Sequence, residues 1–97
     1  MVAVRISISA CHAYRSLPDD DPARAEIERI LFGLVEHGVA LPGAHPTDWP
    51  WGKGTAPGYA LDLTTTAGFV AYAPLVDPRT DEAFVGVIHI VIEGLEG

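Results

Sequence analysis

Several polar residues in the predicted strands have types suited to acid–base chemistry. Side chains alternate between the two faces of a strand. In the predicted strands this alternation places five polar residues on one face of the sheet: Arg5, Ser7, Asp62, Tyr72 and His89. A histidine beside a carboxylate acts as a general base, an arginine stabilises an anion, and a tyrosine donates a proton. These residues predict a catalytic site of His89, Asp62, Tyr72 and Arg5 that needs no cofactor. The alternatives are a polar sheet surface and a register shifted by one residue, which would bury His89.

Candidate binding residues lie in a segment rich in proline and glycine. Residues 42–58 hold four prolines and four glycines, which predicts a long loop without regular structure. Such loops are often functional. Trp49 and Trp51 are expected to contact a partner, because tryptophan is enriched in binding hot spots; Lys53 lies beside them and Ser7 is a further binding candidate. The alternative is that one tryptophan seals the core and the other is half-exposed.

The cysteine and the histidines do not match a metal-binding pattern. Cys11 and His12 are adjacent, and together with His37 and His45 they lack the ligand spacing of a zinc site. No metal is therefore expected. A single cysteine excludes an internal disulfide and fits a reducing, cytoplasmic compartment.

The composition fits one small domain that binds another protein. The 97 residues carry six basic and thirteen acidic side chains, for a formal charge of -7. That charge disfavours non-specific binding to nucleic acid. With 48% apolar residues, exposed apolar surface and hence a partner protein or a second copy are expected. The longest apolar run, residues 83–92, is too short to cross a bilayer, and the N-terminus lacks the pattern of a signal peptide.

The candidate residues are positioned by an expected α+β fold that spans residues 1–97. Alternating apolar residues predict a strand over 2–9, and residues 11–17 are compatible with one or two helical turns. Asp21 and Pro22 are typical of a helix start, and Gly38 is typical of a helix end. Between them runs an apolar stripe that predicts an amphipathic helix, formed by Ile27, Ile30, Leu31, Leu34 and Val35.

The remaining strands predict a three-strand antiparallel meander with the helices on one face. Residues 59–64, 69–75 and 83–92 alternate or run apolar between turn residues. The last strand is expected to be central, because both of its faces are apolar. One set of its side chains is expected to face the helix, and this set consists of Phe84, Ile88, Ile90 and Ile92. The other set would face the open side, Val87, His89, Val91 and Glu93.

The order of these segments resembles the RelE/ParE superfamily of small bacterial toxins. The likeness covers nearly the whole chain and is carried by the strings SACHAYRSLP, DPARAEIERILFGLVEHG, GYALDL, GFVAYAPL and FVGVIHIVI. The family shows a strand, a short helix ending near Leu-Pro, a longer amphipathic helix and a terminal meander. The resemblance implies a type II toxin–antitoxin protein. It would cleave mRNA on the ribosome or poison DNA gyrase, and a partner antitoxin would neutralise it.

The chain departs from the basic pattern of the ribonuclease branch of that family. Ala60, Asp62 and Val70 stand where the family carries basic residues, and the terminal basic segment is absent. Only His89, with Arg5 and Lys53, would match. The resemblance therefore implies a toxin-like protein-binding domain that binds an antitoxin-like protein or a second copy of itself. The departures from the basic pattern count against ribosomal ribonuclease activity.

Two alternatives stand beside the toxin-like domain. One is a small-molecule enzyme that uses His89 and Asp62 on the open sheet face. The other is a homodimer joined through an apolar open face formed by Val70, Val85, Val87 and Val91.

Overall fold

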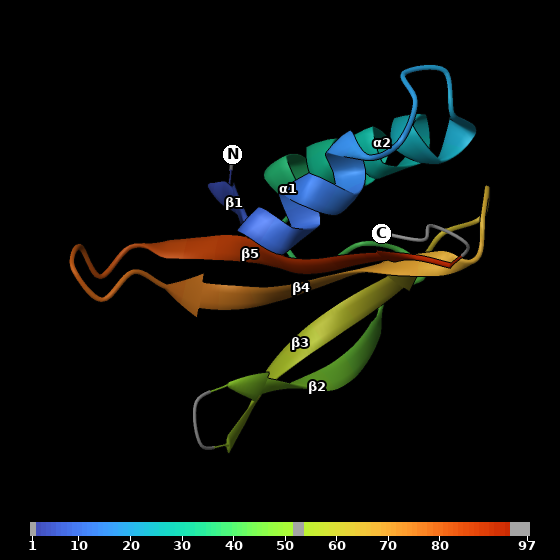
Figure 1. The fold of residues 1–97 in the computed structure, drawn as a ribbon. Coiled ribbons are helices and arrows are strands. Elements are labelled where there is room, and N and C mark those ends of the chain that lie inside the picture. The colour runs from blue at the N-terminus through green and yellow to red at the C-terminus, as the bar shows by residue number, and fades with distance from the viewer. Residues whose placement is uncertain (1, 52–53, 94–97) are drawn as a thin grey trace.

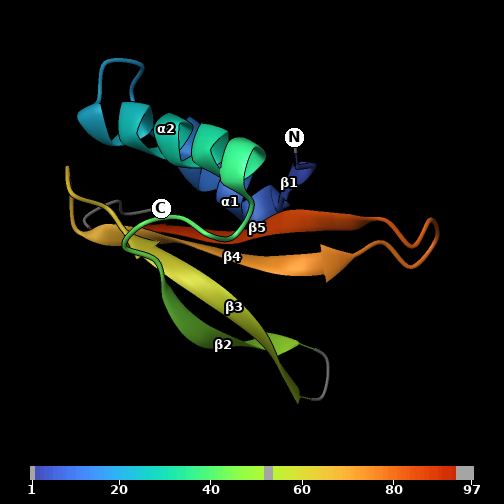
Figure 2. The ribbon, with the colours of Figure 1, turned by 180° about the vertical axis from the view of Figure 1, so that it is seen from behind.

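Within residues 2–51 and 54–93, which the computed structural model describes, two helices cover one face of a five-stranded sheet (Figures 1 and 2). The elements are β1 (Val4–Ile6), α1 (Ile8–Arg15), α2 (Pro22–His37), β2 (His45–Trp51), β3 (Gly54–Asp62), β4 (Gly68–Val76) and β5 (Ala83–Ile92). The strand order is β1-β5-β4-β3-β2, with β1 parallel to β5 and the other pairs antiparallel. The predicted α+β class is confirmed. Neither of the helices described has the length and apolar character needed to cross a membrane.

The long helix, α2, forms as its sequence predicts. The Asp21 carboxylate accepts a hydrogen bond from the Ala23 N–H at 2.9 Å, and Pro22 begins the helix where no N–H is needed. Gly38 ends the helix with a φ of 67°, a conformation that glycine adopts without strain. The buried apolar residues of the helix are Ala23, Ile27, Ile30 and Leu34. The N-cap and the apolar stripe thus specify both the bounds and the inward face of α2.

The predicted strand over residues 2–9 is wrong in its second half, because Ser7 starts a helix there. The Ser7 hydroxyl accepts from the Ala10 N–H at 3.1 Å and donates to the Ile88 carbonyl at 2.7 Å. Serine is a favoured N-cap, so β1 stops at Ile6 and α1 begins at Ile8. Ile8 is 90% exposed as a result. Ser7 therefore caps α1 and lies beyond the end of β1, not within a strand as predicted.

The predicted loop over residues 42–58 is also wrong, because most of it forms a β-hairpin. β2 pairs with β3 from His45 opposite Ala60 to Trp51 opposite Gly54. β2 is an edge strand, and proline is tolerated at such an edge, where its missing N–H breaks no ladder hydrogen bond. Pro46 and Pro50 lie four residues apart and share one edge, because backbone N–H groups alternate between the two sides of a strand. Figure 1 shows this hairpin running away from the helices.

A bulge in β5 changes which of its side chains face the helices. Ala71 pairs with His89, but Tyr72 pairs with Val87, so the pairing skips Ile88. Val85, Val87 and Ile90 all lie in the core. The prediction that Val85 and Val87 face the open side is therefore wrong. β5 lies between β1 and β4, and β4 is the middle strand.

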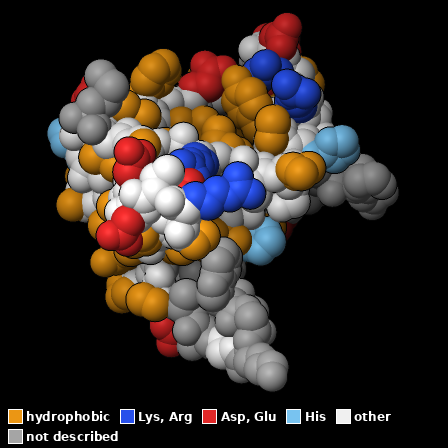
Figure 3. Space-filling view, turned by 90° about the vertical axis from the view of Figure 1, so that its left-hand side faces the viewer, with side chains coloured by type: hydrophobic (Ala, Val, Ile, Leu, Met, Phe, Trp, Pro, Cys, Tyr) orange, Lys and Arg blue, Asp and Glu red, His pale blue; other side chains and the backbone are white. Residues whose placement is uncertain are grey.

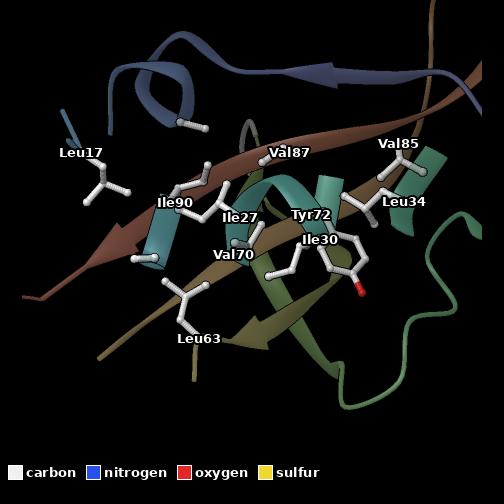
Figure 4. Close-up of a cluster of buried hydrophobic side chains, with 12 residues drawn as sticks. Leu17, Ile27, Ile30, Leu34, Leu63, Val70, Tyr72, Val85, Val87 and Ile90 are labelled. Carbon is white, nitrogen blue, oxygen red and sulfur yellow. The ribbon is translucent and has the colours of Figure 1, made fainter. Parts of the chain in front are cut away.

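Phe84 and two residues of β4 also face the opposite way from the prediction. Phe84 lies against Arg5 on the open face, not under the helices. Val70 and Tyr72 are fully buried in the core, where the Tyr72 hydroxyl donates to the Val39 carbonyl at 3.3 Å. Figure 4 shows Tyr72 beside Leu34 of α2, within a cluster formed by Leu17, Ile27, Ile30, Leu34, Leu63, Val70, Tyr72, Val85, Val87 and Ile90.

A buried carboxylate joins α2 to the turn between β3 and β4. Glu26 is 7% exposed and accepts hydrogen bonds from the Thr64 N–H and hydroxyl at 2.9 and 2.6 Å. It also accepts from the Thr65 N–H and hydroxyl at 3.0 and 2.7 Å. Burial opposes ionisation of Glu26, but these hydrogen bonds outweigh it and lower the pKa from 4.5 to about 2. The carboxylate is therefore ionised at neutral pH and holds the turn against the helix.

Candidate functional site

The structure separates the residues of the predicted catalytic site. Tyr72 lies in the core beneath the helices, on the opposite side of the sheet from the predicted site. Arg5, Asp62 and His89 are exposed, and the strand pairing places all three on the open face. Burial raises the pKa of Tyr72 above its usual range, and the neighbouring Tyr59 adds to the effect. Tyr72 therefore has no access to a substrate on the open face.

Arg5 is engaged in a structural contact. Its guanidinium forms an ion pair with the Asp77 carboxylate at 2.9 Å and lies 4.2 Å from the centre of the Phe84 ring. The Arg79 backbone N–H and the Arg5 side chain hold the pKa of Asp77 below its usual range. Arg5 thus joins β1 to the far end of the β4–β5 hairpin, and its charge is already balanced there.

Asp62 and His89 do not form a dyad. Asp62 pairs across Phe69 with Val91, whereas His89 lies two residues further along β5. Two strand spacings and one side-chain repeat separate the two Cα atoms by about 12 Å. The histidine that approaches Asp62 is His45, whose Nε2 lies 3.8 Å from an Asp62 carboxylate oxygen. The sequence does not predict this pair, because the prolines and glycines around His45 indicate a loop.

Three of the four valines expected to form an apolar open face lie elsewhere. Val70, Val85 and Val87 are in the core, and Val91 is 38% exposed. Strand pairing places small buried residues on this face instead, which we call the small-residue strip: Gly58, Ala60, Ala71, Ala73 and Gly86. The side chains of Trp49 and Trp51 and all of Lys53 fall outside the described residues.

An apolar hollow lies on the other side of the sheet, between β1 and the two helices. This apolar groove has a volume of about 420 Å³ and is lined by Val4, Ile6, Tyr14, Glu28, Leu31, Phe32 and Val35. Phe32 is 69% exposed and Ile6 is 44% exposed. Figure 3 views the molecule from the left-hand side of Figure 1 and shows hydrophobic side chains gathered on that face among charged ones. Large exposed apolar side chains around a groove are typical of a binding surface.

One end of the apolar groove is closed by polar side chains that contact one another. The Tyr14 hydroxyl donates to the Glu28 carboxylate at 2.6 Å, and the Arg24 guanidinium lies 4.6 Å from the centre of the Tyr14 ring. The hydrogen bond to Glu28 and burial raise the pKa of Tyr14 above its usual range. These contacts join α1 to α2 at this end of the groove.

Phe32 is the functional candidate that the sequence analysis missed. The apolar stripe of α2 accounts for the residues on either side of it, and Phe32 falls outside that stripe. A large aromatic side chain on the solvent side of an amphipathic helix was the available signal.

The described residues contain no cluster of three or more histidine, cysteine, aspartate or glutamate side chains that could hold a metal ion. Comparisons with models of known protein families, with curated proteins and with solved structures returned no match.

Proposed function

We propose that this chain is a protein-binding domain of the RelE/ParE type, the toxin-like member of a cytoplasmic type II toxin–antitoxin pair. The observation that carries the proposal is the exposed Phe32 at the apolar groove between β1, α1 and α2. Removing apolar surface from water contributes about 25 cal/mol per Å². A partner that covers Phe32 and Ile6 would remove their apolar surface from water, and this burial would contribute to the affinity of the complex.

The order of the elements supports the RelE/ParE relationship. A strand leads into a short helix and then a long amphipathic helix, and β3, β4 and β5 form a terminal antiparallel meander. β2 adds an edge strand to this order. The segments quoted for the resemblance thus map onto successive elements of one sheet and its helical layer.

Ribosomal ribonuclease activity is not part of the proposal. Docking on ribosomal RNA needs positive charge, and this chain has a formal charge of -7. On the open face Arg5 is already paired with Asp77, and Asp62 is exposed. These charges favour a role that depends on binding protein.

The proposal predicts that a short reading frame beside this gene encodes the partner. When the two proteins are co-expressed, we expect a stable complex by size-exclusion chromatography with light scattering. Phe32→Asp should weaken that complex about 100-fold by titration calorimetry, because truncating a central interface aromatic costs roughly 2–4 kcal/mol and tenfold in affinity is about 1.4 kcal/mol.

The matched control is Val91→Asp, which places the same charge on the open face, where Val91 is 38% exposed. It should bind within about threefold of the wild-type protein. Absence of a complex, or a Phe32→Asp variant that binds as tightly as Val91→Asp, would rule the proposal out.

A further inference from the structure

The charges of this acidic protein are divided unevenly along the chain. Residues 1–18 contain Arg5, His12 and Arg15 and neither aspartate nor glutamate, so their formal charge is +2. All thirteen acidic residues lie in the remainder, whose formal charge is -9. Because β1 and α1 come from residues 4–15, they form a basic element beside the apolar groove.

The outer face of α1 presents this charge together with an exposed apolar residue. Ile8, Cys11, His12 and Arg15 follow the spacing i, i+3, i+4, i+7 and lie on one side of the helix. We call these four residues the basic patch. With Ile6 and Ser7 they line a hollow of about 260 Å³. The opposite side of α1 packs into the core through Ala10, Ala13 and Tyr14.

The two basic side chains of the basic patch, Arg15 and His12, have no ion-pair partner among the residues described. Arg5 pairs with Asp77, and Arg24 pairs with Asp19 at 3.0 Å. Arg15 and His12 are exposed, and neither forms an ion pair with any residue of the described ranges 2–51 and 54–93. The patch therefore carries charge that a bound partner can neutralise.

The basic patch and the apolar groove are continuous through Ile6, which lines both hollows. A segment that fills the groove past Ile6 must therefore cross or border the exposed side chain of Ile8. Charges more than about 8–10 Å apart are screened at physiological salt. The charges nearest the groove and the patch therefore matter more to a bound segment than the net charge of the whole chain. They are Arg15 on α1 and the Glu28 carboxylate, which Tyr14 and Arg24 already contact.

We propose that the segment that docks on this surface is an acidic peptide of the partner protein. Its large apolar side chains fill the groove and cover Ile8, and its carboxylates lie beside Arg15 and His12. This inference rests on the proposed function, because it names the chemistry of the partner at the same groove. A second copy of this chain fits less well, because a two-fold contact through the patch would bring its cations together.

The experiment uses a phage-displayed library of random 12-residue peptides selected on the intact immobilised protein. We expect the selected peptides to combine large apolar residues with an excess of Asp and Glu over Lys and Arg. Synthetic copies carrying fluorescein should bind Arg15→Glu and Phe32→Asp at least tenfold more weakly than the wild-type protein, by fluorescence anisotropy. Raising the salt concentration from 50 to 500 mM should weaken binding to the wild-type protein.

The control is Arg79→Glu, which reverses an exposed charge in the β4–β5 turn and should bind the peptides as the wild-type protein does. Selection of neutral or basic peptides, selection of none, or equal binding to Arg15→Glu would overturn the inference. If the protein self-associates and only Arg15→Glu abolishes this self-association, the patch binds a second copy of the chain and the inference is overturned.

The same Arg15→Glu variant separates this inference from the proposed function. If the neighbouring gene product binds Arg15→Glu normally but not Phe32→Asp, the proposed function stands and the acidic segment is wrong. If acidic peptides bind the patch but the neighbouring product does not bind at all, the surface chemistry stands and the proposed partner is wrong.

Discussion

Replacing Glu26 with alanine is expected to lower the free energy of unfolding by about 3 kcal/mol at pH 7. The change removes a buried carboxylate that accepts hydrogen bonds from both N–H groups and both hydroxyls of Thr64 and Thr65. Hydrogen bonds to a charged group contribute about 1.5–3 kcal/mol each, and water recovers part of that at the exposed threonines. Chemical denaturation monitored by circular dichroism measures the change.

The control for this prediction is Glu36→Ala, which removes an exposed carboxylate from the same helix. Its effect should stay within about 0.5 kcal/mol, as for most surface substitutions. Similar losses for the two variants would show that Glu26 does not hold the β3–β4 turn.

The pH dependence of the free energy of unfolding is a second test of the contribution of Glu26 to stability. The pKa of Glu26 is about 2 in the folded protein against an ordinary value of 4.5. Between these values the unfolded chain binds more protons, so the contribution of Glu26 to stability rises with pH. The stability difference between the wild-type protein and Glu26→Ala should be constant above about pH 5 and should shrink as the pH falls from 4.5 toward 2. A difference that does not change over this range would contradict the assignment.

Replacing Leu34 with alanine is expected to destabilise the protein by about 2–5 kcal/mol, because the truncated side chain leaves a cavity in a packed core. Leu34 is fully buried and lies beside Tyr72 (Figure 4). Leu31→Ala makes the same change one turn earlier on α2, where the side chain is only half-buried at the apolar groove. That variant should cost about 1 kcal/mol, because its surroundings already border solvent. Equal losses for the two variants in urea denaturation would mean that the core is not where the structure places it.

The sequence predicts best those elements for which several sequence signals indicate the same structure. α2 has an N-cap at Asp21, a proline at its first position, an apolar stripe and a glycine at its end, and its observed bounds follow from them. The three strands of the meander likewise form as separate apolar runs between turn residues. Local propensity and burial point to the same structure in these segments, so pattern alone suffices.

The candidate site was harder to predict, because it depends on pairings that lie far apart in the chain. Prolines in residues 42–58 indicate a loop until β2 is known to lie at the sheet edge. The bulge opposite Ala71 and Tyr72 reverses the side chains of half of β5, and alternation within one strand cannot reveal that. Ser7 would have been identifiable as an N-cap, which would have placed Ile8 on the surface of α1.

The most direct measurement of the central claim is a map of the bound partner on this chain. The ¹⁵N-labelled protein would be titrated with the unlabelled product of the neighbouring reading frame, and amide chemical shifts followed by NMR. We expect the largest changes in β1 and in residues 28–35 of α2, which line the apolar groove, and little change along the small-residue strip. Changes concentrated on the small-residue strip, with the groove unaffected, would contradict the claim.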